Sequence, residues 1–125
     1  AIKLMPHLPA AYLQAARIYL RNDQQSQAID ALDKAFSLGA DQINDRIMYG
    51  QVLLNNGRFD EAHSQLRAAT DSAPESGTAW AGLALAAISL GDDQKGRDYL
   101  KRAQMLRPND PLVIQVQDIL TRNRR

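Results

Sequence analysis

The sequence contains no cysteine among its 125 residues. Disulfide bonds, thiolate metal sites and a cysteine nucleophile are therefore excluded. A marked excess of one charge is also missing, because 15 Lys and Arg residues stand against 14 Asp and Glu residues. A protein dedicated to nucleic acid or to acidic lipid normally carries a basic excess. We therefore do not expect nucleic acid to be the partner.

Long apolar runs are missing as well. The longest stretch without a charged residue is the sixteen-residue segment 76–91, whereas a membrane-spanning helix needs about 20 residues. Gly, Ser and Thr interrupt this segment, and no signal-peptide pattern opens the chain. We expect a soluble protein without direct membrane insertion. The pattern leaves the compartment open, and the bacterial cytoplasm and periplasm are both compatible with it.

Signatures of catalysis are absent from the sequence. Asp60-Glu61-Ala62-His63 spells the acidic box of helicases, but that chemistry also needs a phosphate loop that ends in Gly-Lys-Ser/Thr. The nearest segment, GDDQKGRD at 91–98, has Arg97 in place of that lysine. No nucleophile elbow or Gly-rich phosphate loop occurs elsewhere. We therefore expect neither an enzyme nor a cofactor.

Two side-chain groups leave alternatives open. Asp60 and His63 lie three residues apart and could share a weakly bound divalent ion, or they could simply be exposed on a helix surface. His7 and His63 lie on different units, and two imidazoles without a cysteine cannot make an ordinary zinc site. Trp80 and Tyr99 could form a platform for a sugar or a base, or they could pack between helices.

A period of 34 residues organises most of the chain. The same residue recurs after 34 positions at four pairs: Gly57 and Gly91, Leu66 and Leu100, Ala69 and Ala103, and Pro74 and Pro108. This period predicts three aligned units at residues 9–42, 43–76 and 77–110. The breaks at 21–24, 55–58 and 90–93 divide each unit into two helices.

The second helix of each unit repeats a packing pattern. A small residue is followed by Leu four positions later and by Ala three positions after that; the three sets are Ala28/Leu32/Ala35, Ala62/Leu66/Ala69 and Gly96/Leu100/Ala103. Spacings of four and three keep side chains on one helix face. The pattern predicts that the small residue lets the paired helix approach closely while Leu fills the adjacent space.

The first helices carry aromatic and small residues at matching positions. The three sets are Tyr12/Ala15/Ala16/Tyr19, Arg46/Tyr49/Gly50/Leu53 and Trp80/Leu83/Ala84/Ala87. With the 34-residue period, this pattern resembles the tetratricopeptide repeat family. Arg46 stands where that family has an aromatic residue, and Ala40 stands where it has the proline that ends a unit. The resemblance implies an all-α fold, a right-handed solenoid of antiparallel helix pairs.

The two ends of the chain lie outside the three units. Residues 1–8 align with the end of a second helix, so we interpret them as the remnant of a preceding repeat in a longer array; a capping peptide is the alternative. Residues 111–125 predict a capping helix with one apolar face, and its members are Val113, Val116, Ile119 and Leu120. We interpret the Arg residues near the end as a solvated helix terminus, where cations are favourable, rather than as a nucleic-acid contact.

The resemblance also implies where a partner would bind, because the first helices of this family line the concave side of the solenoid. The positions expected to line this groove are Leu13, Gln14, Arg17, Arg21, Ile47, Met48, Gln51, Leu54, Asn55, Ala81, Gly82, Leu85, Ile88 and Ser89. The groove should be basic near the first unit and apolar near the third. We expect a peptide or helix of another protein, with an acid near Arg17 and an apolar anchor near Gly82 and Leu85.

The resemblance to the tetratricopeptide repeat family leads to three hypotheses about function. Some family members hold the terminal carboxylate of heat-shock chaperones, but of the matching positions Leu13, Arg17, Met48, Thr78 and Gly82 only Arg17 is charged, so that activity is not expected. A protein-binding scaffold for complex assembly, secretion or envelope biogenesis is the main hypothesis. A structural spacer that contacts other parts of a longer chain, or a self-association module, is the alternative.

Overall fold

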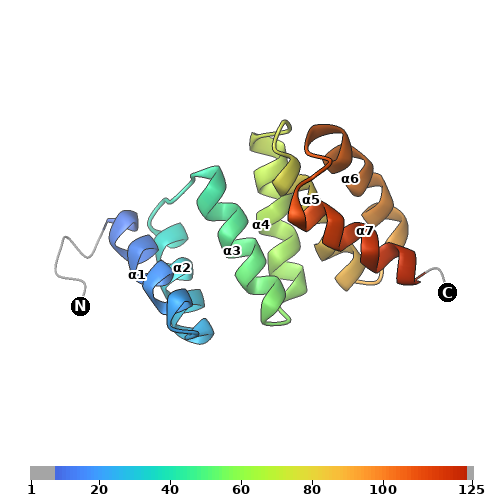
Figure 1. Ribbon diagram of the computed structural model, residues 1–125. Coiled ribbons are helices and arrows are strands. Elements are labelled where there is room, and N and C mark those ends of the chain that lie inside the picture. Colours follow the sequence, from blue (N-terminus) through green and yellow to red (C-terminus); the bar gives the residue numbers. More distant parts are fainter. Residues whose placement is uncertain (1–7, 124–125) are drawn as a thin grey trace.

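The computed structural model describes residues 8–123, and within that range it contains seven α-helices and no strand. They are α1 (Pro9–Arg21), α2 (Gln25–Ser37), α3 (Ile43–Asn55), α4 (Phe59–Ser72), α5 (Gly77–Ser89), α6 (Asp93–Leu106) and α7 (Pro111–Asn123). Figure 1 shows them stacked in chain order, with α1 and α7 at opposite ends. The prediction of an all-α array of helix pairs is therefore confirmed.

Local chemistry explains where the helices begin and end. Gly57 and Gly91 follow α3 and α5 with φ angles of 76° and 89°, in the left-handed region that glycine reaches without a steric penalty. The backbone N–H of Ala79 donates to the side-chain oxygen of Ser76, which caps α5. Pro111 opens α7, where its missing N–H would have had no helical partner.

Asp23 occupies the position equivalent to Gly57 and Gly91 in the first unit, and its φ angle of 58° is also left-handed. A residue with a Cβ is disfavoured in this conformation. We expect Asp23→Gly to raise the free energy of unfolding by about 0.5–1 kcal/mol, measured by urea denaturation. Gly57→Ala is the matched control and should destabilise by about 1 kcal/mol. Destabilisation by Asp23→Gly would contradict this account of the turn.

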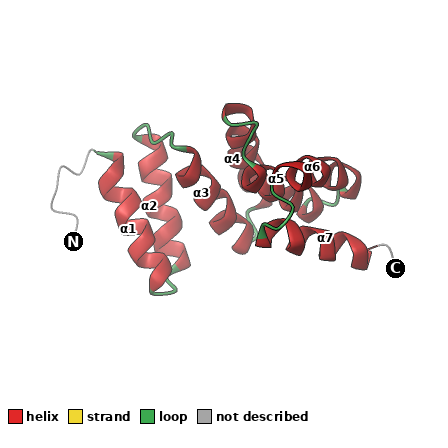
Figure 2. Ribbon diagram, turned by 45° about the horizontal axis from the view of Figure 1, so that its top comes forward, coloured by secondary structure: helices red, strands yellow, loops and turns green. Residues whose placement is uncertain are grey.

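The helices pack as hairpins that lie side by side. α1 packs against α2, α3 against α4 and α5 against α6, while α7 packs on both α5 and α6. Figure 2 shows the short loops that join the helices of each hairpin. The unit boundaries at residues 42, 76 and 110 remain predictions, and each lies in a loop directly before a helix.

The predicted packing pattern of the second helices forms the core. All nine residues of the three sets are buried. Leu66 of α4 is fully buried, and it lies between Gly50 of α3 and Gly82 of α5. A Cβ at either glycine would come within 2.6 Å or 2.8 Å of a Leu66 side-chain carbon. Leu66 therefore joins three helices, and both glycines are needed for their close approach.

The two chain ends differ in what the structure describes. The predicted repeat remnant at residues 1–8 lies outside the described residues, except for Leu8. In α7, Val113, Val116 and Leu120 are buried against α5 and α6, and Ile119 is half-buried. No helix within residues 8–123 is long and apolar enough to cross a membrane.

Candidate functional site on the first helices

The predicted groove residues fall into a buried group and an accessible group. Five are buried, and these are Leu13, Ile47, Leu54, Ala81 and Gly82. Nine are exposed or half-buried, and these are Gln14, Arg17, Arg21, Met48, Gln51, Asn55, Leu85, Ile88 and Ser89. The buried five belong to the packing between helices, so they are not open to a partner in this structure.

Gly82 shows why one face of a helix cannot be assigned from spacing alone. Its Cα faces Leu66 of α4 rather than solvent. By the 34-residue equivalence, Gln14 and Met48 lie on the same side of α1 and α3. Ala81 belongs to the apolar cluster that α7 completes with Val113 and Val116. The apolar anchor that we expected at Gly82 and Leu85 is therefore reduced to Leu85.

Arg17 does not stand free for a partner's acid. Its guanidinium lies 2.5 Å from the carboxylate of Asp45 on α3, forming an ion pair between the first and second units. The Asp45 side chain is only 11% exposed, whereas the Arg17 side chain is 49% exposed. Since a buried carboxylate requires a compensating partner, we interpret Arg17 as a structural cation.

This pairing makes a prediction about stability. Arg17→Met should lower the free energy of unfolding by about 1–3 kcal/mol, because it leaves the Asp45 carboxylate buried without its cation. In an Asp45→Asn background the same substitution should cost much less, because no charge remains to be compensated. Urea denaturation of the four proteins measures this coupling. An equal cost of Arg17→Met in both backgrounds would show that the ion pair is unimportant.

A row of polar and apolar side chains remains accessible along the first helices. Arg21, Asn55 and Ser89 lie 34 residues apart in the last turns of α1, α3 and α5. No ion pair involves Arg21 within residues 8–123. Gln51 and Leu85 lie one turn earlier on α3 and α5. We call this row the first-helix face, and its members are Arg21, Gln51, Asn55, Leu85, Ile88 and Ser89.

The sequence reasoning missed that α7 extends this row. Gln115, Ile119 and Asn123 follow Ala81, Leu85 and Ser89 by 34 residues. Gln115 and Asn123 are exposed, and Ile119 is half-buried. The 34-residue period was the available signal, but α7 was interpreted only as a cap because it lacks the aromatic and glycine positions.

The other candidate sites are accounted for by packing. The indole N–H of Trp80 donates to the carbonyl of Pro74 at 2.7 Å, and the Arg102 guanidinium lies 4.9 Å from the centre of the Trp80 ring. Tyr99 packs on Trp80 with 5.9 Å between ring centres. Arg102 thus covers one face of the Trp80 ring, and Tyr99 packs beside it.

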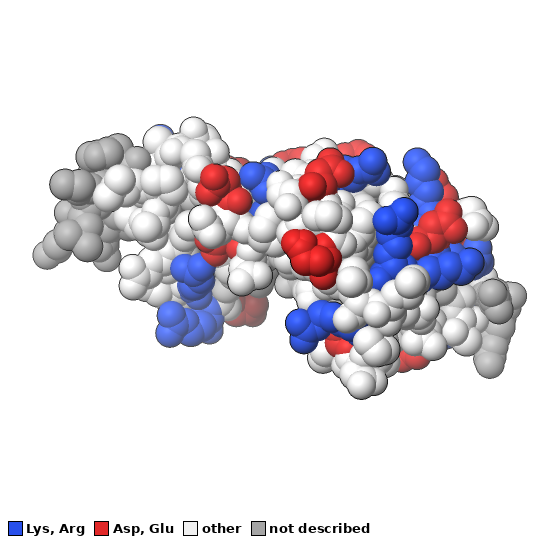
Figure 3. Space-filling model, turned by 90° about the horizontal axis from the view of Figure 1, so that it is seen from above, with Lys and Arg blue, Asp and Glu red and all other residues white. Residues whose placement is uncertain are grey.

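No group of three metal ligands occurs among the described residues, so Asp60 and His63 gain no third ligand there. Burial lowers the pKa of His63, and the nearby cations Arg67 and Lys95 add to this effect. Basic and acidic side chains alternate on the face drawn in Figure 3. This mixture is unlike the single-sign field expected of a nucleic-acid site.

A small hollow lies away from the predicted groove. Its volume is about 250 Å³, and its lining residues are Tyr12, Ala15, Tyr19, Gln27, Asp30 and Ala31. These residues lie on α1 and α2, and none of them belongs to the fourteen predicted positions.

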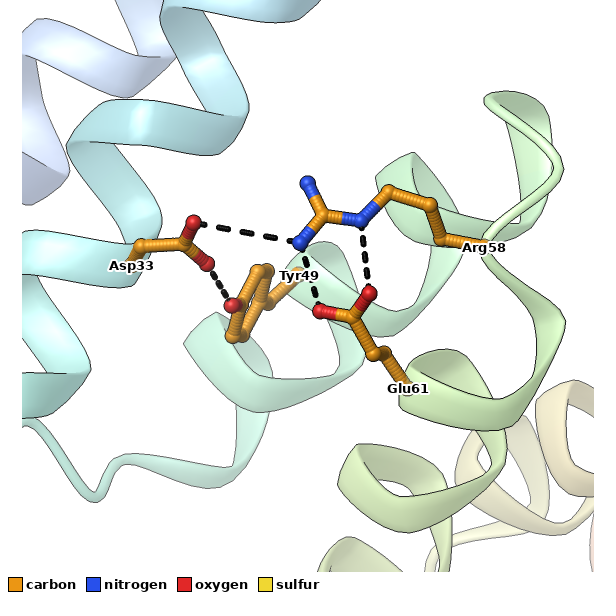
Figure 4. A network of polar contacts seen from close by, with 4 residues as sticks. All are labelled: Asp33, Tyr49, Arg58 and Glu61. Carbon is orange, nitrogen blue, oxygen red and sulfur yellow. Dashed lines mark hydrogen bonds and ion pairs between the residues drawn. The ribbon is translucent and has the colours of Figure 1, made fainter.

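A network of polar side chains joins α2, α3 and the start of α4 (Figure 4). The Tyr49 hydroxyl donates to the Asp33 carboxylate, and Arg58 binds Glu61 through two hydrogen bonds of 2.6 and 2.8 Å. A longer ion pair of 4.0 Å connects Arg58 to Asp33. Burial raises the pKa of Tyr49, and its hydrogen bond to Asp33 raises it further. The Tyr49 phenol therefore stays protonated and holds the two units together.

Similarity to solved structures supports the fold. The chain matches YrrB, a tetratricopeptide repeat protein with an unusual peptide-binding site, at 22% identity over 89% of this chain with a TM-score of 0.80. It spans only 57% of YrrB. MamA (residues 41 to the end) from Desulfovibrio magneticus RS-1 matches at 21% identity, over 94% of this chain and 67% of that chain, with a TM-score of 0.84.

A third solved structure is a complex. It is the first repeat domain of Spaghetti (RPAP3) bound to the HSP90 peptide SRMEEVD, and it matches at 14% identity over 98% of both chains with a TM-score of 0.81. No curated protein matches the sequence. All three structural likenesses are distant in sequence, so they show the fold alone.

Family models give the assignment. One tetratricopeptide repeat model matches residues 9–41, and a second matches residues 47–111. Neither model indicates an enzyme family, and repeats of this family are protein- and peptide-binding modules. The helix pairs, the 34-residue period and these matches together show that the chain belongs to the tetratricopeptide repeat family.

Proposed function

We propose that this chain is a protein-interaction scaffold that holds an extended or helical segment of a partner protein on its first-helix face. Accessible side chains at equivalent positions of α1, α3, α5 and α7 support this proposal. A preformed surface limits the conformational entropy that is lost on binding. Roles in complex assembly, secretion or envelope biogenesis are compatible with such a scaffold.

The chemistry of the row indicates what the partner segment should carry. Arg21 supplies a cation at the end formed by the first unit, and an acid of the partner would pair with it. Asn55 supplies an amide in the middle, and the Ser89 hydroxyl, which donates to the Leu85 carbonyl, can accept a further hydrogen bond. Leu85 and Ile119 supply apolar surface toward α7. We therefore expect the acid of the partner near Arg21 instead of Arg17, because Arg17 already forms an ion pair with Asp45.

Peptide selection followed by variant binding tests this proposal. Peptides selected from a random display library on the intact chain would be measured by fluorescence anisotropy. We expect Arg21→Glu and Leu85→Arg each to weaken binding about tenfold or more, as for charged and apolar anchors in other interfaces.

Two variants on the second helices serve as matched controls. Lys34→Glu reverses an exposed charge on α2, and Met105→Arg places a charge at a side chain that is 85% exposed on α6. Both should leave the dissociation constant within about twofold, as expected for sites outside the interface. The opposite pattern, with only the controls weakening binding, would move the site to the second helices.

A further inference from the structure

The first and second unit junctions are built differently. At the second junction, α4 and α5 lie in close contact over much of their length, whereas α2 touches α3 over a smaller part. Figure 1 shows the α1–α2 hairpin standing apart from α3, while α4 and α5 lie together.

Side-chain size accounts for this difference. The α4–α5 junction contains Thr70, Ala79, Gly82, Leu83 and Ala86, and all five are buried. The equivalent residues 34 positions earlier are Phe36, Asp45, Met48, Tyr49 and Val52. Small residues allow backbones to approach, and large or charged residues hold them apart. The first junction therefore cannot close as tightly as the second.

Buried residues such as Ala35 of α2 and Val52 of α3 belong to one apolar cluster, and the ends of long side chains make further contacts across the first junction. Phe36 stacks on Tyr49 with 5.0 Å between ring centres, and the Asn56 amide donates to Gln25 at 3.0 Å. The contacts of Asp33 with Tyr49 and with Arg58 (Figure 4) and the Arg17–Asp45 pair also cross this junction. Polar tips can exchange partners with water, unlike interlocked apolar surfaces.

The linker at this junction lacks the proline of the other two linkers, and its backbone is held by N–H groups of residues 38–40 that donate to carbonyls of α2. Residues 38–42 form a five-residue connection in which Gly39 has a φ angle of 104°. The linkers at 73–76 and 107–110 have four residues and contain Pro74 and Pro108. Trp80 binds the Pro74 carbonyl, and Asp110 accepts hydrogen bonds from Thr78 and from the Leu112 N–H. Proline fixes its own φ angle, whereas Ala40 does not.

We propose that the α1–α2 hairpin pivots as a rigid arm about residues 38–42, while α3 to α7 form a single body. The hairpin turns on the stacked rings of Phe36 and Tyr49, and the contacts of Asp33 with Tyr49 and with Arg58 stabilise one position of the hairpin. The pivot moves Arg21 relative to Asn55 and Leu85, so it would set the width of the first-helix face. Only this last consequence rests on the proposed binding function; the pivot itself does not.

Pairs of spin labels measure the pivot directly, because the cysteine-free chain accepts labels at chosen sites only. Asp30, Ser64 and Asp98 are exposed equivalents on α2, α4 and α6. The Asp30→Cys/Ser64→Cys pair spans the first junction, and the Ser64→Cys/Asp98→Cys pair spans the second. Pulsed electron paramagnetic resonance should give a distance distribution about twice as wide for the first pair, as expected for hinge motion. Equal widths would overturn the proposal.

Two variants test which features control the arm. Replacing residues 38–42 by residues 73–76 of the second linker transfers that linker's proline without placing a Cβ at the left-handed Gly39, and it should narrow the distribution of the first pair. Arg58→Met removes the connection to Asp33 and should widen it. The second pair should keep its distance in both variants, which shows that the chain is folded. A first-pair width that neither variant changes would rule out this linker and these contacts as the hinge.

Discussion

Leu66→Ala is expected to lower the free energy of unfolding by about 3–5 kcal/mol. Leu66 is fully buried and fills the space opposite both Gly50 and Gly82. Neither glycine has a side chain that could move into the cavity, so the site cannot collapse easily, and the upper part of the range applies. Urea denaturation followed by circular dichroism measures the effect.

An exposed residue on the same helix provides the control for Leu66→Ala. Ser64→Ala changes a solvent-exposed side chain of α4, so it should alter stability by less than about 0.5 kcal/mol. A loss below about 1 kcal/mol for Leu66→Ala would contradict the central position of Leu66, because truncating a buried leucine to alanine rarely costs so little stability.

Gly50→Val is expected to destabilise the protein by about 2–3 kcal/mol through overpacking. A Cβ at residue 50 would lie 2.6 Å from Leu66 Cγ and within 3.0 Å of both Leu66 methyl carbons. The contact is with the branched part of a buried side chain, which has no free space to enter. Glycine is a poorer helix former than valine, so helix propensity would not account for this loss; denaturation of Ser64→Val measures the effect of valine at an exposed helix position.

A double variant identifies the origin of that loss. In a Leu66→Ala background, Gly50→Val should cost much less than it does alone, because the clashing atoms have been removed and the valine fills part of the cavity. Strictly additive costs would show that residue 50 and Leu66 do not share the same space.

Much of this fold could be predicted because its packing is periodic. Leu32, Leu66 and Leu100 recur at one position, and each is buried as that position requires. The signals that end helices were equally local, since Gly57 and Gly91 follow helix ends with positive φ angles. A period tells which residues are equivalent, and equivalent residues in a solenoid have equivalent surroundings.

The accessible surface could not be predicted equally well. Spacing placed Gly82 next to a groove, yet its surroundings depend on how closely α4 approaches α5. We expected a partner's acid near Arg17, and spacing does not reveal its ion pair with Asp45, because Asp45 lies 28 residues away and that separation is not the repeat period. Burial by a neighbouring helix and pairing of charges between units depend on tertiary geometry, which a one-dimensional pattern does not contain.

Departures from the period were informative in another way. Ala40 breaks the pattern set by Pro74 and Pro108, and Phe36 stands where Thr70 stands in the next unit. Both exceptions occur at the junction where the helices are least closely packed. Sequence comparison between units can therefore locate unusual junctions even where it cannot give their geometry.

Nuclear Overhauser effects from the Leu66 methyl groups test the stacking of these units most directly. The account predicts cross-peaks from these methyls to the α-protons of both Gly50 and Gly82, because Leu66 lies against both glycines. These two residues belong to helices before and after α4 in the chain. Cross-peaks to Gly50 alone would contradict the intercalation of Leu66 between successive units, and with it the continuous solenoid.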